Sequence, residues 1–298
     1  MGMEVSVIIP FYKGERWLDE AVMSVCRQEG VEWECIIVDD GSPSPARRHC
    51  SFLGDTRIRL IEKENNGKGA SVNRGIRESR ADIFCVLDQD DQMLPGRLAK
   101  QHAVFCKDPA CDAVYSDYER IREDGSLIDR FTSRQAGNRE HLHILAGGRG
   151  LFSMQTLLMK KRRVLEIGGF CEDRSLCGLD DGEFFLRLLV SGSRLIYEPG
   201  VAGRWIDQGE NFSKTVQFQE ARTVFMEKLK AMACSHQEVA EELPRFRAHH
   251  HFMSGVYYLE HNEAQKARRE FARMIMATPC DWNAYYLFLK SVFRRVVP

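Results

Sequence analysis

Three aspartates, Asp88, Asp90 and Asp91, lie within four residues of one another, directly after the apolar segment 83–87. Carboxylates gathered in this way repel one another, and they cost stability unless a cation lies close to them. A divalent metal ion that holds a phosphorylated ligand would balance this charge, because hard cations prefer oxygen ligands. A solvated acidic turn ahead of a helix that begins near Pro95 would explain the same residues. The spacing alone leaves both interpretations open.

Apolar segments in the N-terminal half indicate the elements that would position these aspartates. Four short apolar runs are typical of strands buried on both faces of a sheet, and they are 5–9, 35–38, 58–61 and 83–87. Strands that alternate with helices imply right-handed crossovers and a doubly wound α/β sheet. Ligands bind outside the carboxyl ends of the strands in such sheets. The polar residues expected to converge there are 10–12, 39–40 and 88–91.

Length and composition narrow the class of protein. The chain has 298 residues, of which 44% are hydrophobic and 29% charged, as in ordinary globular proteins. The net charge of −1 gives no argument for nucleic-acid binding, so we expect no nucleic-acid partner. The ten cysteines form no C-x-x-C pair, which argues against a zinc site or a disulfide framework. We see neither a signal peptide nor a run of about 20 apolar residues, and we expect a cytoplasmic protein.

The pattern becomes wholly helical and richer in charge near residue 215, so we expect one domain at 1–214 and a helical region at 215–298. Two amphipathic segments, 251–261 and 263–278, resemble a single tetratricopeptide-type hairpin. A helical cap on the main domain explains them as well. The apolar and basic tail 285–295 fits either peripheral contact with an anionic membrane surface or packing against the core.

Motifs in the first two thirds of the chain resemble those of the family 2 glycosyltransferases, which have a GT-A fold. The matching segments follow the family's order, and they are 5–12, 37–42, 66–73, 87–91, 167–170 and 179–181. The resemblance covers about residues 4–215 and leaves the helical C-terminal region outside. It implies an inverting transfer of a sugar from a nucleotide diphosphate donor to a glycan or lipid-linked acceptor, on a mixed doubly wound sheet.

The resemblance also implies roles for residues that follow the first strands. Asp40 resembles the position that accepts a hydrogen bond from the uracil imide, which makes UDP the expected nucleotide. Pro10 and Tyr12 would flank the base, the tyrosine by stacking. Asp88 would approach the ribose, whereas Asp39 would either contact the ribose or serve as a turn carboxylate.

The diphosphate would be held through a metal ion. Asp90 would ligate Mn²⁺ or Mg²⁺, and the metal would offset the negative charge that develops on the departing diphosphate. Lys68 would touch phosphate or remain solvated. The family pattern has a histidine where this chain has Asp207, two residues before Gly209. A carboxylate there could still bind the metal, but when ionised it could not donate a hydrogen bond to phosphate.

Asp181 resembles the catalytic base of the family. An inverting transfer needs a carboxylate on the far side of the anomeric carbon, where it takes the proton of the acceptor hydroxyl. The neighbouring Asp180 would raise the proton affinity of the pair by repulsion. An ordinary helix start is the alternative, since aspartates favour the positive end of a helix.

We therefore expect an enzyme of surface polysaccharide, lipopolysaccharide or glycolipid assembly, whose acceptor is held by the loops 132–154 and 170–179. The glycines of 132–150 predict a flexible loop. The missing histidine supports a second hypothesis, a catalytically weak nucleotide-sugar-binding protein whose helical region docks a partner. A dinucleotide-dependent oxidoreductase is disfavoured, because no G-x-G-x-x-G follows the first strand. The sequence gives no oligomeric state.

Overall fold

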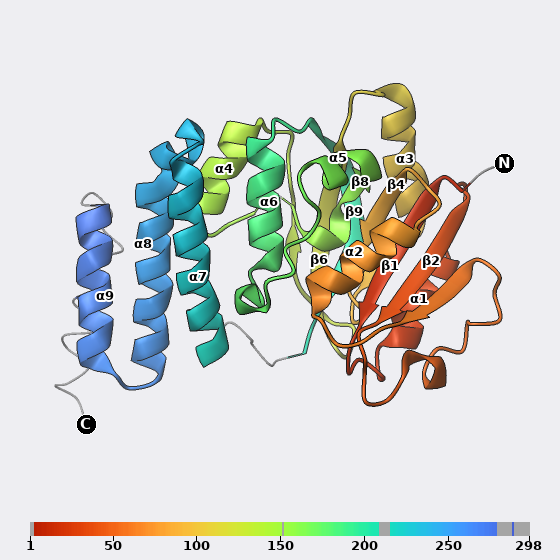
Figure 1. Cartoon of the computed structure of the whole chain (residues 1–298), viewed down its shortest axis with the longest axis horizontal. Helices are drawn as coiled ribbons and strands as arrows, with labels where there is room; N and C mark the ends of the chain where they lie inside the picture. Colours follow the sequence, from red (N-terminus) through yellow and green to blue (C-terminus); the bar gives the residue numbers. More distant parts are fainter. Residues whose placement is uncertain (1–2, 151, 209–214, 279–287, 289–298) are drawn as a thin grey trace. The chain divides into compact units, whose positions relative to one another are not determined.

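A computed structural model describes residues 3–150, 152–208, 215–278 and 288. The chain divides into two compact units (Figure 1). The first comprises 1–138, 151–174 and 183–210, and the second comprises 139–150, 175–182 and 211–298. The second unit thus includes two short segments that precede residue 214, the domain boundary expected from the sequence.

The first unit is built on one mixed sheet with the strand order β3-β2-β1-β4-β8-β6-β9-β5, and β7 pairs with β6. The strands are β1 (Val5–Phe11), β2 (Trp33–Asp39), β3 (Ile58–Glu62), β4 (Ile83–Val86), β5 (Gln92–Met93), β6 (Ala113–Arg122), β7 (Leu127–Phe131), β8 (Leu158–Lys160) and β9 (Leu195–Asp207). The first four strands in the chain are parallel, while β8 runs antiparallel to β4 and to β6. The expected mixed α/β sheet is confirmed.

Helices cover both faces of the parallel part of the sheet. They are α1 (Leu18–Cys26), α2 (Lys68–Glu78) and α3 (Arg97–Lys107). Successive side chains of a strand point to opposite faces, and β1 follows this rule. Val7 and Ile9 belong to the same core cluster as Leu18 of α1 and Leu98 of α3. A β-carbon on Gly75 of α2 would lie 2.4 Å from Ile8, so α2 packs closely on the other face.

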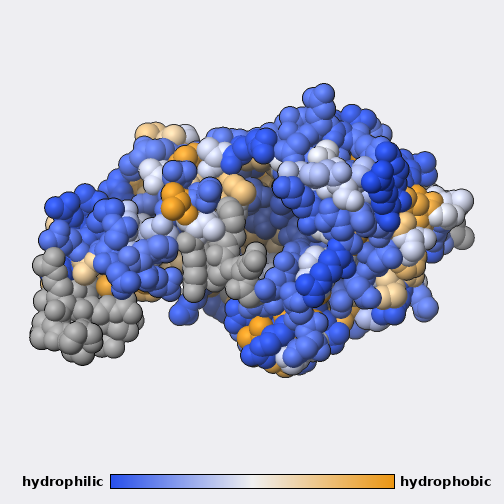
Figure 2. Space-filling model, turned by 90° about the horizontal axis from the view of Figure 1, so that it is seen from below, coloured by the Kyte–Doolittle hydropathy of each residue, from blue (hydrophilic) through white to orange (hydrophobic). Residues whose placement is uncertain are grey.

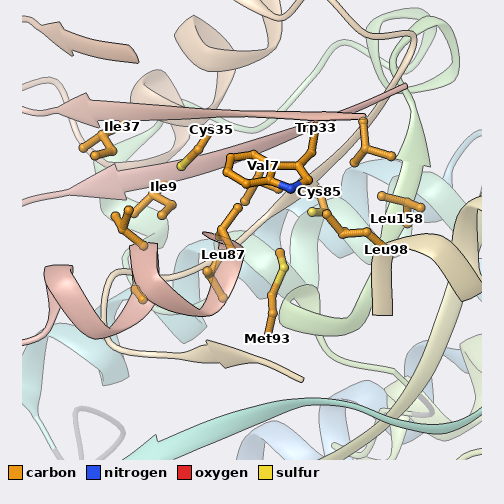
Figure 3. Packing of buried hydrophobic residues seen from close by; sticks show 14 of the residues in the cluster. Val7, Ile9, Trp33, Cys35, Ile37, Cys85, Leu87, Met93, Leu98 and Leu158 are labelled. Atoms are coloured by element: carbon orange, nitrogen blue, oxygen red, sulfur yellow. The ribbon is translucent and has the colours of Figure 1, made fainter. Parts of the chain in front are cut away.

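The core of the first unit lies between β1, β2 and β4 and the helices α1 and α3. Figure 3 shows Val7, Ile9, Trp33, Cys35 and Leu87 turned toward one another among the side chains of this cluster. These residues come from the apolar runs that predict strands, because a strand buried on both faces has few polar positions. Cys35 and Cys85 are fully buried and act as small hydrophobic side chains.

The expectation for the segment 132–150 needs correction. The segment 132–150 was expected to be a flexible loop, yet it contains the helix α4 (Asn138–Ala146). Its buried residues His141, Leu142 and Ala146 stabilise the helix despite the glycines that follow it. The strand β8 follows this segment, after a short 3₁₀ turn over Met154–Thr156. The helices α5 (Lys161–Glu166) and α6 (Asp180–Val190) follow.

The second unit is mainly helical. It contains α7 (Val216–Ala233), α8 (Gln237–Glu260) and α9 (Ala264–Ala277), and Figure 1 shows α8 and α9 side by side, joined by a short turn. Asn262 in this turn has a φ of 61°, a conformation that asparagine tolerates better than most residues. The contacts between α8 and α9 form a small core of Ala248, Leu259, Ala267 and Phe271 with their neighbours.

The segment 251–278 contains the end of α8 and the whole of α9, and α8 begins well before residue 251. The resemblance to a tetratricopeptide-type hairpin stays a prediction. The tail 285–295, for which membrane contact and core packing were both expected, lies outside the described residues apart from Phe288. In the described ranges, no helix has the length and apolar character that crossing a membrane requires.

Few large hydrophobic side chains are exposed among the residues that the structure describes. Figure 2 shows one face, on which hydrophilic residues predominate and hydrophobic residues form small separate patches. Tyr12 and Trp205 are among the exposed aromatic residues of the first unit, at 41% and 43% exposure. Isolated exposed apolar side chains are normal in globular proteins, but Tyr12 lies at the end of β1, where the sequence predicts a ligand.

Candidate functional site

The acidic residues Asp88, Asp90 and Asp91 form a tight loop, called the acidic loop below, directly after β4. Asp91 N donates to the carbonyl of Asp88 at 3.0 Å, which closes the turn. The three carboxylates have different surroundings. Asp88 is partly exposed and pairs with Lys68, Asp90 accepts a hydrogen bond from the side chain of Gln208 at 2.7 Å, and Asp91 is buried.

The electrostatics of the acidic loop follow from this burial. Burial raises the pKa of Asp90 above its ordinary value, and the charge of Asp88 raises it further. Burial also raises the pKa of Asp91, to well above its usual range, with Asp88 and Asp90 adding to the effect. The backbone N–H of Ile206 donates to Asp91 at 3.2 Å and offsets part of this cost. Asp90 and Asp91 therefore hold a proton more readily than ordinary aspartates, and a bound cation would favour their ionised forms.

This donor set fits a hard divalent cation. All its ligand atoms are carboxylate oxygens, and such cations commonly fill their remaining positions with phosphate or water. In the part of the chain that the structure describes, no three His, Cys, Asp or Glu side chains are grouped closely enough to hold a metal by themselves.

Asp39 and Asp40 lie at the C-terminal end of β2, and both carboxylates accept hydrogen bonds. Asp39 accepts hydrogen bonds from the backbone N–H groups of Ser42 and Ala46, both at 2.8 Å. This arrangement favours the turn role for Asp39 over contact with a ribose. Asp40 accepts from Asn66 N at 2.9 Å and Gly67 N at 2.8 Å, and it pairs with Lys63.

The pKa of Asp40 reflects two opposing causes. Burial by itself would raise it, but the hydrogen bonds from Lys63, Asn66 and Gly67 outweigh burial and hold the pKa below its usual value. Asp40 is thus an ionised carboxylate at neutral pH, with both oxygens occupied by protein donors. A nucleobase that bonds to Asp40 would share these oxygens, which have two lone pairs each.

Pro10 and Tyr12 lie at the C-terminal end of β1. Pro10 lies inside β1 and is buried, in register with Val38 of β2. Tyr12 follows the strand and is exposed, and Lys13 Nζ lies 5.2 Å from the centre of its ring. The backbone N–H of Lys13 donates to Ser42 Oγ at 2.9 Å, which ties this exit to the turn after β2.

The N-terminus of helix α2 contacts the residues that follow both β2 and β4. Its first residue, Lys68, bonds to Asp88 of the acidic loop, while Gly67 N, just before the helix, bonds to Asp40. Gly67 has a φ of 94°, which glycine adopts without strain. One turn later, Asn73 accepts from Phe170 N and donates to Phe170 O, both at 2.8 Å. The N-terminal half of α2 therefore contacts two loops of the site and the segment near residue 170.

The end of β9 passes beside the acidic loop. Ile206 and Gln208 bond to Asp91 and Asp90, and Asp207, the last residue of β9, lies between them in the chain. Gln208, one residue beyond the position discussed in the sequence, is therefore the side chain that bonds to Asp90. The stretch after it, 209–214, which completes the motif compared with the family, lies outside the described residues.

Asp180 and Asp181 occupy the first turn of α6. Both belong to a segment of the second unit, 175–182. Oδ2 of Asp180 is buried and has no hydrogen-bond partner in the described part of the chain. The structure thus brings Pro10, Tyr12, Asp40, Lys68, Asp88 and Asp90 together in the first unit with the end of β9, and it places Asp181 at a helix start.

Sequence reasoning missed three residues that hold this site together. Gln89 and Gln208 have uncharged side chains without a pattern of their own, and Lys63 stands outside every motif. Their contacts join positions 77, 118 and 23 residues apart in the chain. Among these three residues, only Gln89 has a signal in the sequence, which is its position inside the acidic loop.

Comparison with known structures defines the class of the fold. The chain is similar to Staphylococcus aureus TarS solved with UDP, with a TM-score of 0.66 and 16% identity, covering 99% of this chain and 87% of that one. It is also similar to the mannosyltransferase PcManGT of Pyrobaculum calidifontis, solved with GDP-Man and Mn²⁺, with a TM-score of 0.58 and 18% identity, covering 100% of this chain and 81% of that one. The fold is that of the GT-A glycosyltransferases.

The sequence places the chain within this class. The glycosyl transferase family 2 model matches residues 6–161, more than half of the chain, so the chain belongs to that family. An uncharacterized glycosyltransferase of Rickettsia conorii is 33% identical over 174 residues, which cover 56% of this chain and 28% of the Rickettsia protein. The chain thus spans well under half the length of this curated relative.

Proposed function

We propose that the chain transfers a sugar from a nucleotide diphosphate, with UDP as the expected nucleotide, to a hydroxyl of a glycan or lipid-linked acceptor. The observation that carries this proposal is the position of the three carboxylates of the acidic loop next to the N-terminus of α2, whose first residue, Lys68, pairs with Asp88. A diphosphate bound through a divalent cation matches both, since helix N-termini favour anions. Family membership and the UDP and GDP-Man complexes of its structural neighbours support it.

The proposed donor contacts follow the strand exits. Asp40 and the ring of Tyr12 hold the base, with buried Pro10 shaping the strand beneath it, and Asp88 holds the ribose. Asp90 and Asp207 hold Mn²⁺ or Mg²⁺, which when bound offsets charge on the leaving diphosphate as a Lewis acid. Lys68 exchanges its contact with Asp88 for one with phosphate, because an ammonium group prefers the denser charge of a diphosphate.

In the proposed reaction, the acceptor oxygen attacks the anomeric carbon while the bond from that carbon to the diphosphate oxygen breaks. Asp181 takes the proton of the acceptor hydroxyl, and the nucleoside diphosphate leaves with the bonding electrons. The configuration at the anomeric carbon is inverted, because attack and departure occur on opposite sides. We propose that the acceptor belongs to surface polysaccharide, lipopolysaccharide or glycolipid assembly.

A thermal-shift screen of UDP- and GDP-sugars with and without Mn²⁺ tests donor binding, because a ligand that binds the native state raises its melting temperature. Release of UDP or GDP with acceptor present then tests turnover. Asp181→Asn should keep donor binding and lose turnover by about 10²- to 10⁴-fold, the usual contribution of a general base. Asp82→Asn, at an exposed position ahead of β4, is the matched control and should act like the parent.

Two outcomes would change the proposal. Full activity of Asp181→Asn would remove the assignment of the base. Donor binding without turnover against any acceptor would favour the second function, a nucleotide-sugar-binding protein, which the replacement of the family histidine by Asp207 supports.

A further inference from the structure

The side chain of Gln89 bonds to the backbone of Tyr12 at two points. Tyr12 N donates to Oε1 of Gln89 at 2.8 Å, and Nε2 of Gln89 donates to the carbonyl of Tyr12 at 3.1 Å. Gln89 is the second residue of the acidic loop, between Asp88 and Asp90. One carboxamide thus joins the proposed base site to the proposed metal site.

Gly14 provides the space for this carboxamide. A β-carbon at Gly14 would lie 2.1 Å from Cδ, 2.3 Å from Nε2 and 2.4 Å from Oε1 of Gln89. All three distances are far below ordinary contact, so any larger residue at position 14 would displace the carboxamide. Gly14 is itself buried. The carboxamide therefore packs closely against Gly14, between the loops that follow β1 and β4.

The Gln89 carboxamide lies just beyond the point where the pairing of β1 with β4 ends. Pairing of β1 with β4 extends from Val5 and Ile83 to Ile8 and Val86, and one further bond joins Leu87 N to the carbonyl of Ile8. The acidic loop begins directly after that point. Backbone polar groups need partners, and the Gln89 carboxamide offers Tyr12 a donor and an acceptor as a neighbouring strand would.

The backbone on the C-terminal side of Tyr12 is also fixed by a hydrogen bond. Lys13 has a φ of 54°, an uncommon conformation for this residue type, and its N–H bonds to Ser42 Oγ. Ser42 in turn donates its N–H to Asp39. The Tyr12–Lys13 backbone is thus attached to the turn after β2 on one side and to the acidic loop on the other.

We propose that Gln89 is a positioning residue, which fixes the backbone of Tyr12 against the acidic loop so that the base and the metal-bound diphosphate of one donor are held at a set separation. This inference rests on the proposed function. Gln89 acts through Tyr12 and through its neighbours Asp88 and Asp90, and it needs no contact with the donor.

Gln89→Met tests this role, since methionine keeps most of the volume and removes both hydrogen bonds. We expect the affinity for UDP in the presence of Mn²⁺ to fall about tenfold by calorimetry, as the loss of two ordinary hydrogen bonds implies. The donor KM should rise more than kcat falls. Gln237→Met is the matched control, because it removes an exposed carboxamide bond to Glu241 on α8.

A second readout needs no ligand. Exchange of the Tyr12 amide hydrogen, measured by NMR, should be faster in Gln89→Met than in the parent, because its acceptor is gone. Gly14→Ala should give the same faster exchange by displacing the carboxamide. In the Gln89→Ala background, Gly14→Ala should add little, because the clash is removed and the two effects are not additive. Gly14→Ala also serves if Gln89→Met does not fold.

The outcomes separate this inference from the proposed function. A parent protein that binds no UDP- or GDP-sugar with Mn²⁺ would overturn the proposed function and the role of Gln89 with it. Parent-like UDP affinity in a folded Gln89→Met, or fully additive effects of the Gly14 and Gln89 changes on Tyr12 exchange, would overturn only the role of Gln89.

Discussion

Lys68 Nζ lies 2.9 Å from Oδ1 and 3.1 Å from Oδ2 of Asp88, so the first residue of α2 pairs with the first carboxylate of the acidic loop. Both side chains are about one-third exposed, at 33% and 31%. A pair of this exposure contributes little to stability. The pair instead affects the charge of the acidic loop, because Lys68 balances the carboxylate of Asp88.

Lys68→Met should raise the affinity for Mn²⁺ alone by about fivefold, because removing a nearby cation removes ~1 kcal/mol of repulsion at high dielectric. The same change should weaken binding of UDP with Mn²⁺, since a proposed phosphate contact is lost. Isothermal titration with Mn²⁺ and then with UDP measures both. Lys100→Met, an exposed position on α3, is the control. If neither affinity changes, Lys68 is a solvated lysine with no part in the site.

Asp91→Asn should stabilise the fold at neutral pH. The folded pKa of Asp91 lies well above its unfolded value near 3.9 because of burial first and then of Asp88 and Asp90. Such a group stabilises the fold fully below the unfolded pKa, and this contribution is lost as the pH rises through the folded pKa. Asparagine keeps an oxygen for the Ile206 N–H.

We expect the free energy of unfolding of Asp91→Asn to exceed that of the parent by about 1–3 kcal/mol at pH 8, the usual cost of burying a polar group without full compensation. The difference should shrink toward pH 4. Urea unfolding at both pH values without metal measures it, with Asp82→Asn as the exposed control. Equal stability of parent and variant at pH 8 would contradict the raised pKa of Asp91.

Asp40→Asn should have the opposite pH dependence. The pKa of Asp40 lies below its usual value because the donors Lys63, Asn66 and Gly67 outweigh burial. A carboxylate of this kind stabilises the fold above its unfolded pKa, and the contribution is lost as the pH falls through the lower folded pKa. The variant should be less stable than the parent by about 1–3 kcal/mol at pH 7.

The same difference should shrink as the pH falls below the usual pKa of an aspartate, because the parent carboxylate becomes protonated as the pH passes through its lowered folded pKa. Urea unfolding from pH 7 to pH 3 measures it. A difference that stays constant over this range would mean that lost packing, and not lost charge, causes the effect.

Gly69→Ala should destabilise the protein by about 1–3 kcal/mol through overpacking. A β-carbon at Gly69 would lie 2.1 Å from the backbone carbonyl oxygen of Cys171, so α2 or the segment near residue 171 must move. Because α2 also carries Lys68, donor affinity should fall as well. Thermal melting with and without UDP and Mn²⁺ checks both effects.

Gly54→Ala is the matched control for this change. Position 54 has open space around a β-carbon and no positive φ, so alanine there should leave stability within about 1 kcal/mol of the parent. Equal melting temperatures for the two variants would show that α2 and the segment near residue 171 separate without cost.

Much of the parallel half of the sheet could be predicted from the sequence. The apolar runs correspond to β1, β2, β3 and β4, and the expected helix after Pro95 is α3. Buried parallel strands have this simple pattern because both of their faces exclude water. The helix α4 was not expected, since its buried face depends on tertiary neighbours and the glycines on either side of it argue for a loop.

The sequence by itself determined the family and the kinds of residue at the strand ends. Carboxylates after β2 and β4 had to meet at one edge, because parallel strands end on the same side of a sheet. Their roles toward a donor remain predictions.

Only the tertiary structure decided how these residues are held. Gln89 reaches Tyr12, Gln208 reaches Asp90 and Lys63 reaches Asp40 across large separations in the chain. Such contacts depend on the length and direction of single side chains after the strands have paired, and they follow no periodicity. The same folding buries Asp91 and raises its pKa, which no spacing of aspartates could have shown.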